Sequence, residues 1–150
     1  MTRRILVTGM SGTGKSSALR ALAERGCRVV DTDEPGWGDG ATWDAARMAA
    51  LLAEEGERPL VVSGTVENQG SFYDRFDAVV LLSAPAAVLL ERIAARTTND
   101  YGKSDAERTL ILEHVRTVEP LLRATCTHEL DATRPLAEVV DALSAIAAGT

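Results

Sequence analysis

The segment ILVTGMSGTGKSS, residues 5–17, decides how this chain folds. It contains the spacing G-x-x-x-x-G-K-S over residues 9–16, in which glycines allow a tight turn that points backbone N–H groups at phosphate oxygens. An apolar run precedes the loop and an apolar pattern typical of a helix follows it. This strand–loop–helix context is what a phosphate-binding loop (P-loop) requires, because the helix N-terminus adds its dipole to the N–H groups. The segment predicts that the chain binds a nucleoside triphosphate; the alternative is a glycine-rich turn with Lys-Ser by chance.

Each residue of this loop has an expected part in binding. We expect the backbone N–H groups to surround the phosphates, the lysine to reach the β- and γ-phosphates, and the first serine hydroxyl to ligate Mg²⁺. The predicted cofactors are therefore ATP and Mg²⁺. The loop residues predicted to bind the nucleotide are Gly9, Met10, Ser11, Gly12, Thr13, Gly14, Lys15, Ser16 and Ser17.

Composition limits the class of protein. The chain has 150 residues, 45% of them hydrophobic and 25% charged, which fits one soluble domain over residues 1–150. Its net charge of −6 argues against binding to nucleic acid. No apolar run approaches the roughly 20 residues that cross a bilayer, and the start runs directly into the P-loop, so neither a membrane span nor a signal peptide is expected. Cys27 and Cys126 lie outside metal or redox spacing, which predicts a cytoplasmic protein, and we expect a monomer or weak homodimer.

Strand-like runs alternate with helical patterns along the whole chain, which predicts an α/β fold. The expected architecture is a three-layer α/β/α sandwich with a five-stranded parallel sheet, a P-loop NTPase of nucleotide kinase-like form. Expected strands cover about residues 3–8, 28–31, 59–64, 77–83 and 127–132. Expected helices cover the stretch after the P-loop to about 24, then about 42–55, from 85, 105–123, and a last helix that Thr133 and Pro135 open as N-cap and first residue.

Two carboxylates follow the second expected strand. Asp31 and Asp33 are two residues apart, so in extended backbone both point into the same cleft. We expect Asp31 to organise Mg²⁺ and Asp33 to orient or deprotonate an acceptor hydroxyl; an acidic loop start is the alternative for Asp33. The third strand ends in Ser-Gly-Thr, 63–65, without the acidic residue typical of motor NTPases, which favours a small kinase.

The acceptor region is expected at about residues 32–58. Arg47 would face the acceptor, and Gly64 would let backbone approach it closely; a plain turn is the alternative for the glycine. Trp43 either contacts the acceptor or belongs to the core.

A turn-rich break at about residues 96–104 predicts a mobile basic lid that excludes water when it closes. Arg96 is the principal lid cation and Lys103 the second. Arg92 and Arg108 are either further cations of this group or solvated helix residues. The two histidines, His114 and His128, are expected to be surface or structural residues.

With these residues in view, the chain resembles the shikimate kinase and nucleoside monophosphate kinase group of P-loop kinases. GMSGTGKSS resembles the phosphate loop of the group, and VVDTDE resembles the acidic pair of shikimate kinases. The second likeness implies that Asp31 orders Mg²⁺ and Asp33 contacts the acceptor hydroxyl. ERIAART resembles the entry to the lid, which implies that Arg96 stacks on adenine. DATRP resembles the adenine loop after the fifth strand, which implies adenine binding by Arg134 and Pro135.

The acceptor side departs from the pattern of shikimate kinases. The triple glycine after their third strand is replaced by SGT, their Arg-Pro-Leu-Leu lid segment by TTNDYGKSD, and the region between strands two and three is short. The chain is in this respect similar to small bacterial kinases labelled shikimate kinase-like or AAA-type ATPase, whose acceptor no motif fixes.

The sequence therefore predicts an ATP-dependent kinase that moves the γ-phosphoryl group to a small metabolite or a nucleoside monophosphate. Lys15, Asp33 and Arg96 are the expected catalytic residues, and Asp33, Arg47 and Gly64 the expected acceptor contacts. The alternative is a nucleotide-binding regulator or slow NTPase without a small acceptor, whose lid and 64–76 loop would act as switch segments.

Overall fold

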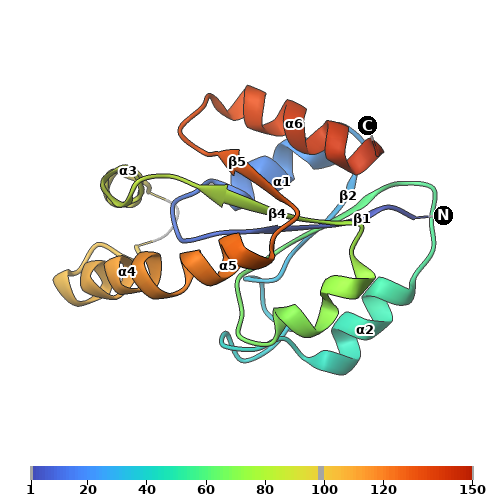
Figure 1. The fold of residues 1–150 in the computed structure, drawn as a ribbon, viewed down its shortest axis with the longest axis horizontal. Coiled ribbons are helices and arrows are strands. Elements are labelled where there is room, and N and C mark those ends of the chain that lie inside the picture. Colours follow the sequence, from blue (N-terminus) through green and yellow to red (C-terminus); the bar gives the residue numbers. More distant parts are fainter. Residues whose placement is uncertain (1, 98–99, 150) are drawn as a thin grey trace.

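Five parallel strands form one sheet in the computed structural model, which describes residues 2–97 and 100–149. The strand order is β2-β3-β1-β4-β5, so the strand that leads into the P-loop lies in the middle (Figure 1). This arrangement confirms the expected α/β fold. The strands are β1 (Arg4–Thr8), β2 (Arg28–Asp31), β3 (Leu60–Ser63), β4 (Ala78–Ser83) and β5 (His128–Asp131).

Helices cover both faces of the sheet and make it the middle of three layers. Figure 1 shows α1 and α6 on one face and α2 and α5 on the other. The helices are α1 (Lys15–Glu24), α2 (Ala45–Ala53), the 3₁₀ helix η1 (Gln69–Arg75), α3 (Ala86–Ala95), α4 (Asp105–Thr117), α5 (Glu119–Thr125) and α6 (Leu136–Ala148). In the part of the chain that the structure describes, no helix is both long and apolar enough to span a bilayer.

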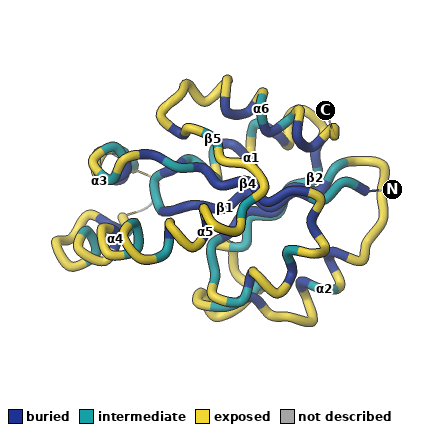
Figure 2. The backbone as a smooth tube through the Cα atoms, in the orientation of Figure 1, coloured by how far each residue is buried: buried dark blue, intermediate teal, exposed yellow. Residues whose placement is uncertain are grey.

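The core divides according to the two-residue period of the strands. In β1, Ile5 and Val7 pack toward α1 and α6, whereas Leu6 packs toward α2 and η1. In β3, Val61 and Val62 alternate in the same way. All of these side chains are at most 1% exposed, and the buried sheet with its exposed outer helix surfaces is visible in Figure 2. Strands buried on both faces read as continuous apolar runs, which is why the sequence located them well.

Helix boundaries differ from the expectation at three places. The single helix expected over 105–123 is two helices, α4 and α5, because Pro120 has no N–H to continue the α4 ladder and instead lies in the first turn of α5. Helix α2 begins at Ala45 rather than 42, since the Asp44 side chain caps it by accepting from the Arg47 N–H.

The predicted start of the last helix was also wrong. Pro135 is the N-cap of α6, and Thr133 lies outside the helix with its N–H and hydroxyl bound to the Asp131 carboxylate. The expected irregular stretch 64–76 contains η1.

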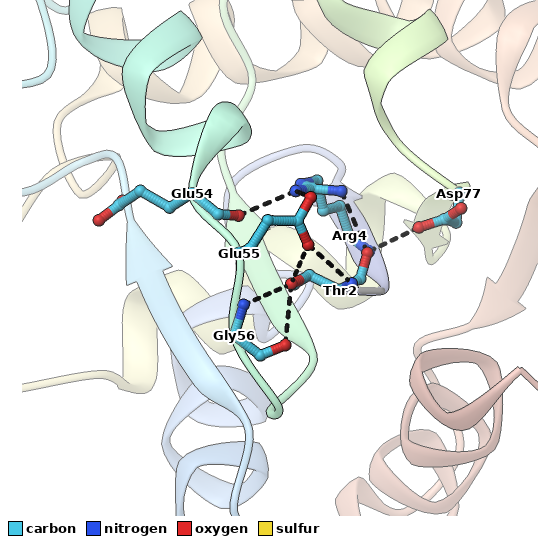
Figure 3. Close-up of polar contacts among 6 residues, drawn as sticks. All are labelled: Thr2, Arg4, Glu54, Glu55, Gly56 and Asp77. Carbon is cyan, nitrogen blue, oxygen red and sulfur yellow. Dashed lines mark hydrogen bonds and ion pairs between the residues drawn. The ribbon is translucent and has the colours of Figure 1, made fainter.

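A group of polar contacts closes the amino end of the sheet, opposite the P-loop (Figure 3). The Thr2 hydroxyl donates to the Gly56 carbonyl oxygen at 2.9 Å and accepts from the Gly56 N–H at 2.7 Å. The Arg4 guanidinium donates to the Glu54 carbonyl oxygen at 2.8 Å, and the Arg4 N–H donates to Asp77 at 2.7 Å. These contacts attach the chain after α2 and the start of β4 to the first strand.

Candidate active site

A cleft of about 790 Å³ opens at the carboxyl ends of the strands, where parallel α/β sheets bind ligands. Its volume falls in the range of about 300–1,000 Å³ that is usual for small-molecule sites. Of the predicted site residues, the complete P-loop, Asp33, Arg96 and Arg134 line it, whereas Asp31, Arg47, Gly64 and Pro135 do not. The lining residues are Gly9, Met10, Ser11, Gly12, Thr13, Gly14, Lys15, Ser16, Ser17, Arg20, Asp33, Gly40, Thr65, Arg92, Arg96, Tyr101, Ile111, His114, Ala132, Arg134, Leu136 and Val139.

Close backbone packing holds the P-loop in place. A Cβ atom added to Gly9 would lie 2.4 Å from the Leu82 carbonyl oxygen of β4, which leaves no room for a side chain. Gly12 has φ +88°, a left-handed conformation that L side chains rarely adopt, and a Cβ added there would lie 3.0 Å from the Leu89 carbonyl oxygen of α3. The loop is therefore fixed by the strand and helix beside it, and its conformation depends on glycine at both positions.

Lys15 lies half-buried at the start of α1, folded back along the loop. Its ammonium group donates to the Gly9 carbonyl oxygen at 2.6 Å and to the Met10 carbonyl oxygen at 3.1 Å. Burial lowers the pKa of Lys15 to about 8, against the opposing pull of Asp33 and Asp31. The charged form of Lys15 is thus less stable here than in water, and an anion bound beside the ammonium group would stabilise the charged form.

Ser16, in the first turn of α1, contacts Asp31, the last residue of β2. The Ser16 hydroxyl donates to one Asp31 carboxylate oxygen at 2.8 Å, and the other oxygen accepts from the Asp33 N–H at 3.0 Å. A hydroxyl and a carboxylate are oxygen ligands of the kind that Mg²⁺ prefers. In residues 2–97 and 100–149 no group of three or more acidic, histidine or cysteine side chains could hold a metal. The pair therefore fits Mg²⁺ that takes its remaining ligands from phosphates and water, as this ion does with nucleotides.

The Asp33 carboxylate is exposed to the cleft and has no hydrogen-bond or ion-pair partner among the described residues. Its charge acts on Lys15 across the cleft. A carboxylate without a partner keeps its acceptor capacity for a ligand hydroxyl, which is the property the sequence analysis required of this residue.

A polar network supports the P-loop from behind, and sequence reasoning missed it. The Thr65 hydroxyl, which follows β3, lies 2.8 Å from the Gly9 carbonyl oxygen and 3.0 Å from the Thr8 hydroxyl. The buried Gln69 side chain donates to the Thr8 hydroxyl at 3.1 Å and to the Tyr73 hydroxyl at 2.9 Å. Thr65 is 56 positions from Gly9 and Gln69 is 61 positions from Thr8 in sequence, and the pairing of β1 with β3 brings them together.

Arginines on α3 form the opposite side of the cleft. Arg92 donates to the Ala132 carbonyl oxygen at 2.6 Å and to the Gly12 carbonyl oxygen at 3.4 Å, which joins the P-loop to the loop after β5. Arg96 donates to the Tyr101 carbonyl oxygen at 2.7 Å, and Lys103 donates to the Arg96 carbonyl oxygen at 2.6 Å. The predicted lid, 96–104, includes residues 98–99, which lie outside the described part.

The loop after β5 contributes one further cation. Arg134 lines the cleft and pairs with Glu138 at 3.2 Å, while Pro135 caps α6 outside the lining. His114 also lines the cleft, together with Ile111 on the same face of α4. His114 was expected to be a surface or structural residue, and its spacing of three from Ile111 was the signal available for a place in the lining.

Arg47 and Gly64 lie apart from the cleft lining, each in a packing role. The Arg47 guanidinium lies 4.2 Å from the Trp37 ring centroid and donates to the Gly36 carbonyl oxygen. A Cβ on Gly64 would lie 2.2 Å from the Thr32 hydroxyl and 3.3 Å from Trp43. Their parts in acceptor binding remain predictions.

Trp43 is 3% exposed and belongs to the core. Its indole N–H donates to the Thr32 hydroxyl at 2.9 Å, which satisfies its one polar group inside the fold.

The loop, the central strand and the Ser16–Asp31 pair together define a P-loop NTPase of nucleotide kinase-like fold. A family model described as "AAA domain" matches residues 5–113, and the chain belongs to this family.

Relatives extend along most of the chain. It is 31% identical over 147 residues to "Putative adenylate kinase" of Archaeoglobus fulgidus, covering 97% of this chain and 82% of the relative. It is also 31% identical over 166 residues to "Shikimate kinase 2" of Yersinia enterocolitica, covering 94% and 93%. Among solved structures, a gluconokinase from Sinorhizobium meliloti 1021 is 27% identical with a TM-score of 0.69, covering 97% of this chain and 91% of that one.

Proposed function

We propose that this protein is an ATP-dependent phosphotransferase that moves the γ-phosphoryl group of ATP to a small metabolite or a nucleoside monophosphate. The observation that carries the proposal is the convergence of three parts at one cleft: the P-loop with Lys15, the lining residue Ser16 with its partner Asp31 beside the cleft, and the unpaired Asp33 carboxylate. The names of the relatives, which are kinases of small molecules, support the same class of reaction.

The donor side supplies positive charge around the transferring group. Phosphate bound at the loop would compete with the Gly9 and Met10 carbonyl oxygens for the Lys15 ammonium group, and would stabilise its charge. Arg96, which lines the same cleft, is placed to add a second positive charge. Ser16 and Asp31 would hold Mg²⁺, which neutralises charge on the β- and γ-phosphates when bound. Catalysis of this kind is mostly positioning and electrostatic stabilisation.

The acceptor side supplies a proton acceptor. Asp33 has no competing hydrogen bond, so a hydroxyl in the cleft could donate to it directly. Asp31 accepts from the Asp33 N–H and thereby fixes the backbone from which that side chain projects. Two carboxylates that are close in sequence would thus have separate tasks, one toward the metal and one toward the acceptor.

The experiment that tests the proposal is ADP release from ATP and Mg²⁺ across a panel of small alcohols and nucleoside monophosphates. We expect acceptor-dependent ADP release that Lys15→Ala abolishes. Asp33→Asn should lower kcat by about 10²–10⁴-fold with little change in nucleotide affinity. Asp74→Asn makes the same chemical change at an exposed position of η1 and serves as the matched control. Slow release that no acceptor alters would instead favour the regulator or slow NTPase.

A further inference from the structure

The positive charges of the cleft all come from the donor side. The 16 lysines and arginines of the chain lie within residues 2–97 and 100–149, so their positions are known. Those that line the cleft belong to the P-loop and α1, to α3, and to the loop after β5. They are Lys15, Arg20, Arg92, Arg96 and Arg134. In these described ranges, the segment from β2 to β4, residues 32–77, contributes no cation to the lining.

Each arginine of that segment is directed elsewhere. Arg47 lies over the Trp37 ring and binds the Gly36 carbonyl oxygen. Arg58 lies two residues before β3, at the amino end of the sheet and therefore at the edge opposite the cleft. Arg75 ends η1 with its guanidinium 5.9 Å from the Phe72 ring centroid, just before β4 begins at the same amino edge. None of these three arginines therefore lines the cleft on the side formed by residues 32–77, which we call the acceptor wall.

What this wall does present is neutral or acidic. It reaches the cleft through Asp33, Gly40 and Thr65, and the Thr65 hydroxyl is already bound to the P-loop. Asp33 and the exposed Glu34 beside it have no side-chain partner in the part of the chain that the structure describes. An anionic acceptor at this wall would lie beside the Asp33 carboxylate, and no cation of residues 32–77 lines the cleft to balance its charge, whereas recognition of carboxylate or phosphate in proteins depends on such cations.

Resting on the phosphotransferase function proposed above, we infer that the acceptor is a hydroxyl compound without negative charge, a polyol or an amino alcohol. Its hydroxyl would donate to Asp33, and the acidic wall would tolerate or attract an ammonium group on the same molecule. The relatives reported above have names that refer to adenylate, shikimate and gluconate, which are anions. By this inference, the acceptor of this chain differs in charge from the compounds to which those names refer.

The first test compares acceptors that share a carbon skeleton or nucleoside and differ in whether they carry a charged group. ADP release is measured with D-gluconate, D-glucitol and 1-amino-1-deoxy-D-glucitol, with shikimate and its methyl ester, and with AMP and adenosine. We expect kcat/KM for the uncharged or cationic members to exceed that of their anionic partners by about tenfold or more. Preference for the anionic member in every set that reacts would overturn the inference and leave the kinase intact. ADP release that is indifferent to all acceptors would overturn the phosphotransferase proposal, and the inference with it.

The second test reverses the charge of the wall. Glu34→Lys should raise the ratio of kcat/KM for anionic over neutral acceptors by about threefold or more at low ionic strength, and added salt should remove the gain. Glu57→Lys makes the same charge change in the loop before β3, at the far edge of the sheet, and should leave the ratio unchanged. An equal effect of both variants, or no effect of the first, would contradict the placement of Glu34 beside the bound acceptor and overturn the inference.

Discussion

Nucleotide binding should weaken as the pH rises through about 8, because burial lowers the pKa of the free Lys15 ammonium group to that value. Bound phosphates favour the charged form and raise the pKa of Lys15 in the complex. Affinity is therefore fully present below pH 8, and is lost progressively as the pH rises toward the pKa of the complex. If only the charged form binds, the apparent Kd grows in proportion to 1 + 10^(pH − 8). Between about pH 7.5 and 9 this is about eightfold, or about 1.2 kcal/mol.

Isothermal titration calorimetry in two buffers of different ionisation enthalpy measures both the Kd and the protons taken up. We expect about half a proton per ADP at pH 8, where half of the free Lys15 is neutral, and nearly one at pH 9. The phosphate groups themselves are ionised at these pH values, since a phosphate monoester titrates near about pH 6.

Lys15→Arg keeps the charge at every pH used and should flatten the dependence, whereas Lys103→Arg, outside the cleft lining, should preserve it. Constant affinity from pH 7.5 to 9, or an unchanged slope in Lys15→Arg, would refute the reasoning.

Three further substitutions test the packing around the site. Gly9→Ala should abolish nucleotide binding and lower the free energy of unfolding by about 1–3 kcal/mol in urea titrations, since its Cβ would meet the Leu82 carbonyl oxygen. The control is Gly70→Ala, where a Cβ meets nothing within 4 Å, and it should lower the free energy of unfolding by less than about 0.5 kcal/mol. Trp43→Ala should cost about 3–5 kcal/mol by the same measurement, whereas a role only in acceptor binding would leave stability intact and change KM. Thr2→Val should cost about 1–3 kcal/mol without altering kcat, and a loss of activity at full stability would speak against its placement far from the cleft.

The sequence predicted the sheet and the donor half of the cleft well, because both depend on local patterns. Buried strands are continuous apolar runs, and the P-loop is a contiguous motif whose lysine and serine carry their own chemistry. The contact of Ser16 with Asp31 followed from two strand ends at one edge of a parallel sheet.

Residues that act through long-range contacts escaped the same reasoning. Thr65 and Gln69 bind groups near the P-loop only because β3 pairs with β1, and nothing in their neighbouring sequence indicates this. Arg47 was expected to face the acceptor from its helix position, yet the structure places its guanidinium on Trp37, whose position depends on the fold of the preceding loop. Side-chain direction within an irregular segment is not encoded in a periodic pattern, so these contacts could not be predicted before the fold of the segment was known.

The contacts that hold the strands at the amino end of the sheet lie at the opposite end from the cleft. Thr2 and Arg4 bind the backbone at Gly56 and Glu54, between α2 and β3, and these contacts support the pairing of Arg4 with Leu60 at the amino end of the sheet. Residues 32–44 lie toward the other end of the sheet, where Asp33 and Gly40 line the cleft and Thr32 binds the Ser63 carbonyl oxygen at the end of β3. We therefore expect substitutions at exposed positions of this segment, such as Glu34, to alter acceptor binding while the contacts at the amino end keep β3 in place beside the P-loop.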